Sequence, residues 1–330
     1  YKLPVDPATP PGTYHFEVGM YDFVTGQSYG VAKSVGSVTL TPPQTIPQLD
    51  TLPLETTLIS PIDDALTLVG HTYTDLTVPP GAEIVGKIFW QASRSIDQAY
   101  KLEFALLGAD QTKYVIAELP LSAAYPVAEW RRSEAVGAAY KFRIPAVAPA
   151  GNYPLVVSVV NAQTGAYVGP VTDLARITVT AQQRNFELPP NVTPISAVIN
   201  DEIELVGYRL DDQTVAPRHS FGLTLYWRSL QPARSNYTVF VHAVGPDQVM
   251  RGQWDSVPVQ GQAPTGGWLP GEIIEDHYEV PMAKDAPPWK YDIFVGMYDP
   301  TTGKRLPLTN FQAPTSDNRV WLTRVQVEEE

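Results

Sequence analysis

The sequence predicts an all-β protein of tandem antiparallel β-sandwich domains, of either the immunoglobulin-like or the jelly-roll type. Three observations support this prediction. The 330 residues are 44% hydrophobic, enough for packed cores, and include 32 prolines but no long helix-forming run. The chain repeats itself with a domain-sized period. Within the repeats, apolar and polar side chains alternate, which is the pattern of half-buried strands.

The composition also restricts the partners. A net charge of -12 argues against nucleic acid, which needs a basic surface to neutralise its phosphates, and disfavours an anionic membrane surface for the same reason. The longest apolar stretches, such as Leu155 to Val160, are far shorter than the roughly 20 residues that cross a bilayer. The chain contains no cysteine, so it has neither a disulfide framework nor thiolate metal ligands.

Three segments resemble one another, and each runs into a Thr-Gly turn. They are Tyr14–Asp22, Tyr153–Asn161 and Tyr291–Asp299. Other landmarks recur at a constant spacing. Trp90 pairs with Trp227 at 137 positions (227 − 90), and the Leu-Val-Gly run at 68–70 returns at 205–207 with the same period. A period held over several landmarks indicates repeated domains of one fold.

Alternation assigns the same inward side chains to matching strands. One strand directs four residues inward in each copy: Phe221, Leu223, Leu225 and Trp227 in the last, and Ile84, Gly86, Ile88 and Trp90 in the middle. Each full copy holds about eight such strands, separated by turns rich in Gly, Pro and Asp. This spacing is typical of a sandwich but does not separate the immunoglobulin-like from the jelly-roll strand order.

The repeats set the domain boundaries. We expect the C-terminal third of a repeat at residues 1–40 and complete repeats at 54–180 and 195–330, with Pro-rich linkers at 41–53 and 181–194 that act as semi-rigid spacers. The first segment holds only the signature strand, its turn and a closing strand, so its core is incomplete. We expect either that the chain is part of a longer protein or that a neighbouring chain completes residues 1–40, as in a homo-oligomer.

No segment reads as a catalytic centre. Residues 26–30 fit the G-x-S-x-G pattern of a serine nucleophile, but that chemistry requires a strand-to-helix turn, and here the motif leaves a β-hairpin. We interpret it as a coincidence. The five histidines lack the spacing of a zinc site, although His242 and His277 could converge beside Asp276 in the last repeat. We predict no cofactor and no metal site.

The acidic residues around position 272 allow two interpretations. They are Glu272, Glu275, Asp276 and Glu279. A glycoside hydrolase needs two carboxylates about 5–10 Å apart across a cleft. On an exposed strand and its leading loop, the same residues would form only a solvated face, which is the interpretation we favour.

At the turns after the three matching segments, we expect Asp22, Asn161 and Asp299 to cap backbone N–H groups rather than to bind calcium.

The last repeat differs from the middle one at outward positions. Alternation places four aromatic residues there: Tyr226, Phe240, Phe294 and Tyr298. Exposed aromatic rings stack on sugars or bury against a neighbour, so one hypothesis makes this face a contact surface for a glycan or a protein. The alternative is that a loop or an adjoining domain covers it.

One family resemblance concerns mainly the last repeat. The runs that carry it are Leu205–Leu210, Leu225–Trp227, Tyr237–His242, Trp268–Glu272 and Val295–Pro300. They resemble the β-sandwich region C-terminal to the membrane spans of bacterial family-39-like (dolichyl-phosphate-mannosyltransferase-type) membrane glycosyltransferases and related surface proteins. In that family membrane-embedded loops carry the catalysis, and none of them is present here. The resemblance therefore implies an extracytoplasmic location and an accessory role, and no catalytic residue.

These observations favour a non-catalytic array at the cell surface or outside the cell. It would act as a spacer and interaction module, with glycan as one candidate partner, beside a membrane glycosyltransferase. The alternative is a structural subunit of an extracellular filament or surface layer, assembled by strand complementation through residues 1–40. An enzyme that uses the carboxylates near Glu272 is a third hypothesis.

Overall fold

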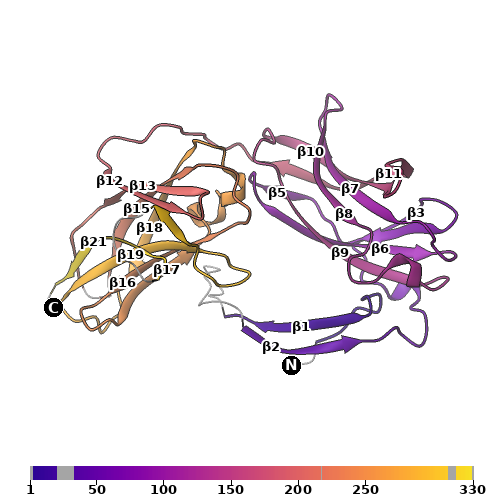
Figure 1. The fold of residues 1–330 in the computed structure, drawn as a ribbon, viewed down its shortest axis with the longest axis horizontal. Coiled ribbons are helices and arrows are strands. Elements are labelled where there is room, and N and C mark those ends of the chain that lie inside the picture. The colour runs from indigo at the N-terminus through magenta and orange to yellow at the C-terminus, as the bar shows by residue number, and fades with distance from the viewer. Residues whose placement is uncertain (1–2, 21–32, 217, 311–316, 329–330) are drawn as a thin grey trace. The chain divides into compact units, whose positions relative to one another are not determined.

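The structure confirms the all-β fold. The computed structural model describes residues 3–20, 33–216, 218–310 and 317–328, and the regular structure in these ranges is almost entirely β-strand (Figure 1). The helical segments there are single 3-10 turns, at Leu49–Thr51, Val127–Glu129, Val259–Gly261 and Thr265–Gly267. Within these ranges, none of the helical turns has the length or the apolar character needed to span a bilayer.

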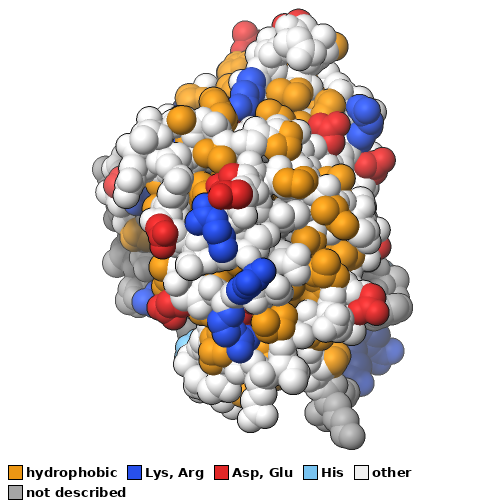
Figure 2. All heavy atoms as spheres, turned by 90° about the vertical axis from the view of Figure 1, so that its right-hand side faces the viewer, with side chains coloured by type: hydrophobic (Ala, Val, Ile, Leu, Met, Phe, Trp, Pro, Cys, Tyr) orange, Lys and Arg blue, Asp and Glu red, His pale blue; other side chains and the backbone are white. Residues whose placement is uncertain are grey.

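The chain divides into two compact units. The first comprises Tyr1–Glu17, Ser34–Val78 and Ala82–Ala181, and the second comprises Val18–Lys33, Pro79–Gly81 and Gln182–Glu330. Each unit has its own hydrophobic core, and each core lies between two sheets. The face drawn in Figure 2 mixes Lys and Arg with Asp and Glu, and apolar side chains lie between them.

The first unit pairs a four-stranded sheet with a five-stranded sheet. The first sheet runs in the order β3 (Thr56–Pro61), β4 (Leu66–His71), β6 (Glu83–Ala92) and β9 (Ala135–Arg143). The second runs in the order β5 (Leu76–Val78), β11 (Tyr167–Val179), β10 (Gly151–Asn161), β7 (Tyr100–Leu107) and β8 (Lys113–Pro120). Neighbouring strands are antiparallel except β5 and β11, which are parallel.

The second unit has the same strand order. Its first sheet contains β18 (Ile273–Pro281), β15 (Ser220–Ser229), β13 (Ile203–Leu210), β12 (Thr193–Ile199) and a short edge strand, β20 (Leu308–Asn310). Its second sheet contains β14 (Thr214–Val215), β21 (Val320–Val327), β19 (Lys290–Tyr298), β16 (Thr238–Val244) and β17 (Met250–Ser256). Again only the short strand, β14, runs parallel to its neighbour β21.

This order resolves the alternative that the sequence leaves open. If β4, β6 and β9 are named A, B and E, then β7, β8, β10 and β11 take the places of C, C′, F and G, and β5 becomes A′. An A-B-E sheet facing a G-F-C-C′ sheet is the immunoglobulin-type arrangement. The same letters apply to β13 to β21 of the second unit, where β20 is an addition to the A-B-E sheet.

A tyrosine at the start of the F strand reinforces this assignment. The hydroxyl of Tyr153 donates to the carbonyl of Pro149 at 2.8 Å, and that of Tyr291 donates to the carbonyl of Pro287 at 3.0 Å. A tyrosine that bonds back to the backbone at the E–F corner is a hallmark of immunoglobulin-type sandwiches.

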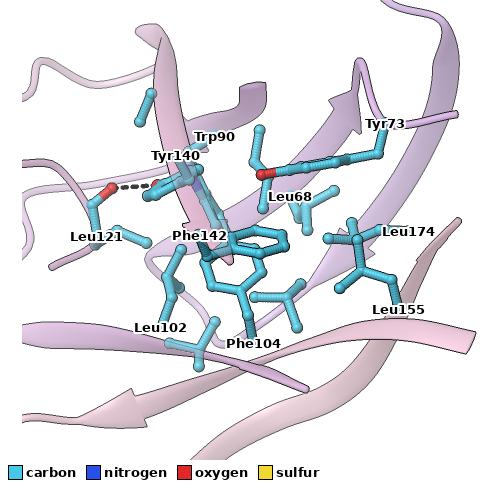
Figure 3. Packing of buried hydrophobic residues seen from close by; sticks show 14 of the residues in the cluster. Leu68, Tyr73, Trp90, Leu102, Phe104, Leu121, Tyr140, Phe142, Leu155 and Leu174 are labelled. Carbon is cyan, nitrogen blue, oxygen red and sulfur yellow. Dashed lines mark hydrogen bonds between the residues drawn. The ribbon is translucent and has the colours of Figure 1, made fainter. Parts of the chain in front are cut away.

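Each core is filled from both sheets. In the first unit, Phe104 of the C strand packs against Phe142 of the E strand, with ring centroids 4.8 Å apart (Figure 3). Trp90 of the B strand donates its indole N–H to the hydroxyl of Tyr140, which in turn donates to the carbonyl of Leu121. Both buried polar groups therefore have partners, as a core requires.

The Pro-rich segments lie against the sandwich that follows them. Leu52 packs on Phe89, on the outer face of the A-B-E sheet, and Val192 packs in the same way on Tyr226. The repeated Leu-Val-Gly runs explain how this is achieved. A Cβ at Gly70 would lie 2.9 Å from the Leu54 side chain, and one at Gly207 would lie 2.2 Å from Cγ1 of Val192. Glycine thus lets each segment approach the sheet closely.

The third, partial repeat forms a separate two-stranded sheet. Its strands are β1 (Gly12–Val18) and β2 (Lys33–Leu40). Most of their side chains are exposed. The intervening residues 21–32, which contain the G-x-S-x-G pattern and Asp22, lie outside the described residues.

Replacing Gly207 with alanine should destabilise the second unit. The new methyl group would overlap Val192 and approach the Thr193 carbonyl to 3.0 Å, so we expect a loss of about 1–3 kcal/mol, the usual cost of overpacking. Urea unfolding followed by tryptophan fluorescence measures this loss. Gly36→Ala is the control, because a Cβ there has no neighbour within 4 Å. Equal stability of the two variants would contradict the close-approach explanation.

Candidate functional site

The carboxylate of Glu272 is a structural group in this fold. It is buried, accepts a hydrogen bond from the Leu269 backbone N–H at 2.8 Å and forms an ion pair with Arg184 at 2.7 Å. In the first unit, Glu134 occupies the equivalent place and accepts from the Arg131 N–H at 2.7 Å. The expectation of a solvated face is therefore wrong for Glu272, which fixes the turn that enters the E strand.

Asp276 is likewise buried, inside the second core. Its carboxylate accepts hydrogen bonds from the Trp227 indole at 3.2 Å, the Val259 N–H at 2.8 Å and the Tyr278 hydroxyl. Val259 has φ 52°, an unfavourable conformation for a β-branched residue, so Asp276 anchors a strained loop. Burial raises the pKa of Asp276 to about 6, although the three donors oppose this shift.

The remaining acidic residues of this stretch are exposed and point away from the core. Glu275 accepts from the Tyr226 hydroxyl at 3.1 Å, and Glu279 lies 3.1 Å from the ring of His277. The alternating burial of β18 thus sends Asp276 to one face of the sheet and Glu275 and Glu279 to the other. The strand does not bring a pair of carboxylates together across a cleft.

The two histidines of the last repeat do not converge. His242 lies on β16 and His277 on β18, which belong to different sheets. Within the described residues, no group of three or more His, Asp or Glu side chains is arranged to hold a metal ion.

Asn161 and Asp299 cap backbone N–H groups at their turns, as expected. Asn161 accepts from the N–H groups of Gln163 and Thr164, both at 3.0 Å, and Asp299 accepts from the N–H of Thr301 at 2.7 Å.

The four outward aromatic residues do not form one surface. Tyr226 lies on the A-B-E sheet, whereas Phe240, Phe294 and Tyr298 lie on the other sheet. Three of them are buried, which agrees with the alternative that the face is covered: Tyr226 is 0% exposed, Phe240 1% and Tyr298 8%. Tyr226 is covered by Val192 and bonded to Arg209, whose guanidinium donates to its hydroxyl at 3.1 Å.

Two arginines cover the aromatic rings on the other sheet. The Arg305 guanidinium lies 4.7 Å from the centre of the Phe240 ring, and that of Arg319 lies 4.0 Å from the centre of the Phe294 ring. Both arginines also pair with Asp317. Cation–π contact and ion pairing together close this face, which is why sequence alternation alone overestimates its exposure.

The closed face also perturbs two titrating groups. Burial, followed by repulsion from Arg305 and Arg319, lowers the pKa of His242 to about 4. Burial and the neighbouring Asp255 carboxylate raise the pKa of Tyr298 to about 12. Both side chains are therefore neutral at pH 7.

Trp321 is an exposed aromatic residue that the sequence analysis did not identify as a candidate contact residue. Trp321 lies outward on the G strand and is 42% exposed. It borders a surface hollow of about 370 Å³, whose other lining residues are Gln213, Thr214, Lys290, Thr323, Arg324 and Gln326. The Trp321 indole donates to Asp292 at 2.8 Å, which fixes the orientation of the ring. The signal that was available is the Val-Trp-Leu run at 320–322, because alternation between two inward residues sends the tryptophan out.

An oriented, partly exposed indole beside hydrogen-bonding side chains can bind a polyhydroxylated ligand. The ring offers an apolar face, and the amide, hydroxyl and cationic groups around the hollow offer polar contacts.

No protein-family model and no curated protein sequence matches the chain.

Stability should depend on pH through Asp276. Because its folded-state pKa of about 6 lies above its ordinary value of 3.8, the folded chain holds a proton that the unfolded chain releases. Stability from this residue is therefore largely present at pH 4 and is lost as the pH rises to 7, by about 2 kcal/mol.

Asp276→Asn should remove that dependence. Thermal unfolding at pH 4 and pH 7 gives the wild-type-minus-variant difference, which we expect to be more favourable to the wild type at pH 4. Asp247→Asn is the control. The Arg251 guanidinium lowers the pKa of Asp247 to about 2, so its contribution stays nearly constant over this range. An equal difference at both pH values for Asp276→Asn would contradict the raised pKa.

Proposed function

We propose that the chain is a non-catalytic tandem array of immunoglobulin-type sandwiches that acts as a spacer and interaction module at the cell surface. The observation that supports this proposal is that the candidate catalytic side chains, Glu272, Asp276 and His242, are occupied by contacts within the fold. Glu272 and Asp276 are bound by backbone and side-chain donors inside the fold, and His242 is buried under arginines. These groups therefore stabilise loops and sheet faces and are not free to act on a substrate.

Glycan is the ligand class that we propose for the second unit. Trp321 supplies the stacking platform, and Lys290, Arg324 and Gln326 supply hydrogen-bond donors around the hollow. The net charge of -12 suits a neutral ligand better than a polyanion.

The cellular setting that we propose follows from the family resemblance. A β-sandwich region beside a membrane glycosyltransferase would lie on the extracytoplasmic side and would hold or present the glycan that the enzyme handles. The Pro-rich segments support a spacer role, because each is packed onto the following sandwich and so limits the freedom of the connection.

Removal of the Trp321 ring should weaken glycan binding. We expect the wild-type chain to retain at least one neutral oligosaccharide on a glycan array, and Trp321→Ala to bind it about fivefold less tightly, since one ring-stacking contact contributes about 1 kcal/mol. Trp289→Ala is a matched control, because Trp289 is 39% exposed and does not line the hollow. Equal affinity of both variants, or no retention by the wild type, would contradict the glycan assignment.

A structural subunit of a filament or surface layer is the second candidate. The exposed apolar side chains of β1 and β2 favour it, because such surfaces drive assembly. Sedimentation over a range of concentrations separates the two functions. We expect a constant monomer mass for the interaction module, whereas growth into polymers would support the filament. Hydrolase activity that disappears in Glu272→Gln would contradict both.

A further inference from the structure

The residues that lead into β1 form the same corner as the E–F connections of the two complete sandwiches. The hydroxyl of Tyr14 donates to the carbonyl of Pro10 at 2.7 Å, as Tyr153 and Tyr291 do to the prolines four residues before them. The turn before the proline also recurs. Its N–H-to-carbonyl bonds are Thr9 to Asp6 at 2.9 Å, Ala148 to Pro145 at 3.1 Å and Ala286 to Ala283 at 3.0 Å. Thus β1 and β2 have the local structure of F and G strands.

The apolar side chains of this corner are exposed, although their counterparts are buried. The exposed fractions are 67% for Leu3, 57% for Val5, 37% for Phe16, 57% for Val18 and 69% for Met20. At the matching positions of the second unit they are 0% for Val280, 4% for Met282, 0% for Ile293, 0% for Val295 and 1% for Met297. In the first unit, Phe142, Ile144, Leu155, Val157 and Val159 are also at most 5% exposed. The five side chains of the first corner therefore occupy positions that are buried in the core of a complete sandwich, but here they are exposed.

The F strand of this corner also has an unpaired edge. In both complete units the F strand bonds to the G strand on one side and to the C strand on the other, as β10 does with β7 and β19 with β16. Within the described residues, β1 pairs with β2 alone. A two-stranded hairpin is marginally stable in water, and a free edge with an apolar face is a site for adding strands.

We propose that the exposed apolar side chains within residues 3–20 and 33–40 form a docking surface for the A-to-E strands of another immunoglobulin-type repeat, whose C strand bonds to the free edge of β1 and whose A-B-E sheet covers Phe16, Val18 and Met20. Ala8 and Pro10 are buried and lie outside this surface. The occupant has the alternating apolar pattern of residues 193–277. A second copy of the chain does not fit this surface as well, because the A-to-E strands of both complete units already bind their own F and G strands. The proposal goes beyond the interaction module above and does not depend on glycan binding.

The test joins a set of A-to-E strands to the chain of residues 1–330. Residues 193–277 are joined directly ahead of Tyr1, because Tyr1 stands 13 positions before Tyr14, as Tyr278 stands 13 before Tyr291 (14 − 1 and 291 − 278). Amide exchange in β1 and β2 is then measured with and without the extension. We expect exchange to slow by at least about 100-fold in the extended chain, since the hairpin becomes part of a cooperative core.

Two variants of the extended chain test the packing. Val18→Ser should abolish the slowing because Val18 then lies in a core, whereas His15→Ser should leave it intact, because His15 points to the opposite face of β1. Residues 54–139 are a second donor, in case the first junction does not fold. Fast exchange in the hairpin with both donors would overturn the proposal, as would a chain without extension that already protects the hairpin by self-association.

Discussion

Each sandwich depends on one constraint: the apolar face of its F strand must be covered by a second sheet. In the complete units, Val157 and Val295 meet this constraint and are 1% and 0% exposed, because the A-B-E sheet lies opposite them. In the partial repeat, Val18 occupies the matching position, but within the described residues no second sheet lies opposite it, and it is 57% exposed. The tyrosine corner forms in all three cases, so it is a local structure that does not require the rest of the sandwich.

The outer faces of the sheets follow a second rule, which is that chain segments and arginines cover most of the aromatic rings there. The Pro-rich segments cover Phe89 and Tyr226, while Arg305 and Arg319 cover Phe240 and Phe294. The contacts of the Pro-rich segments explain why close-packed glycines recur at positions 70 and 207 of the two units. Trp321 differs from these rings, because it is 42% exposed.

Sequence reasoning was therefore reliable for some features and unreliable for others. It was reliable for inward residues, because strand alternation and the repeat both assign them: Trp90 and Trp227 are fully buried. It was unreliable for outward residues. Alternation tells which face of a sheet a side chain takes, but not what lies on that face, so whether Tyr226 is exposed or covered stayed open. For Glu272 and Asp276, the run of acidic residues suggested a solvated face, whereas both carboxylates are buried and accept hydrogen bonds from the backbone N–H groups of Leu269 and Val259.

By itself, the sequence determined the all-β class, the repeat period and the inward side chains, because these depend on local alternation and on spacing along the chain. Tertiary structure decided the immunoglobulin-type strand order, the covering of the outer faces and the exposure of the β1–β2 hairpin. These features arise from contacts between residues far apart in the chain. Period-two alternation is the same whichever strands are paired, so it cannot specify them.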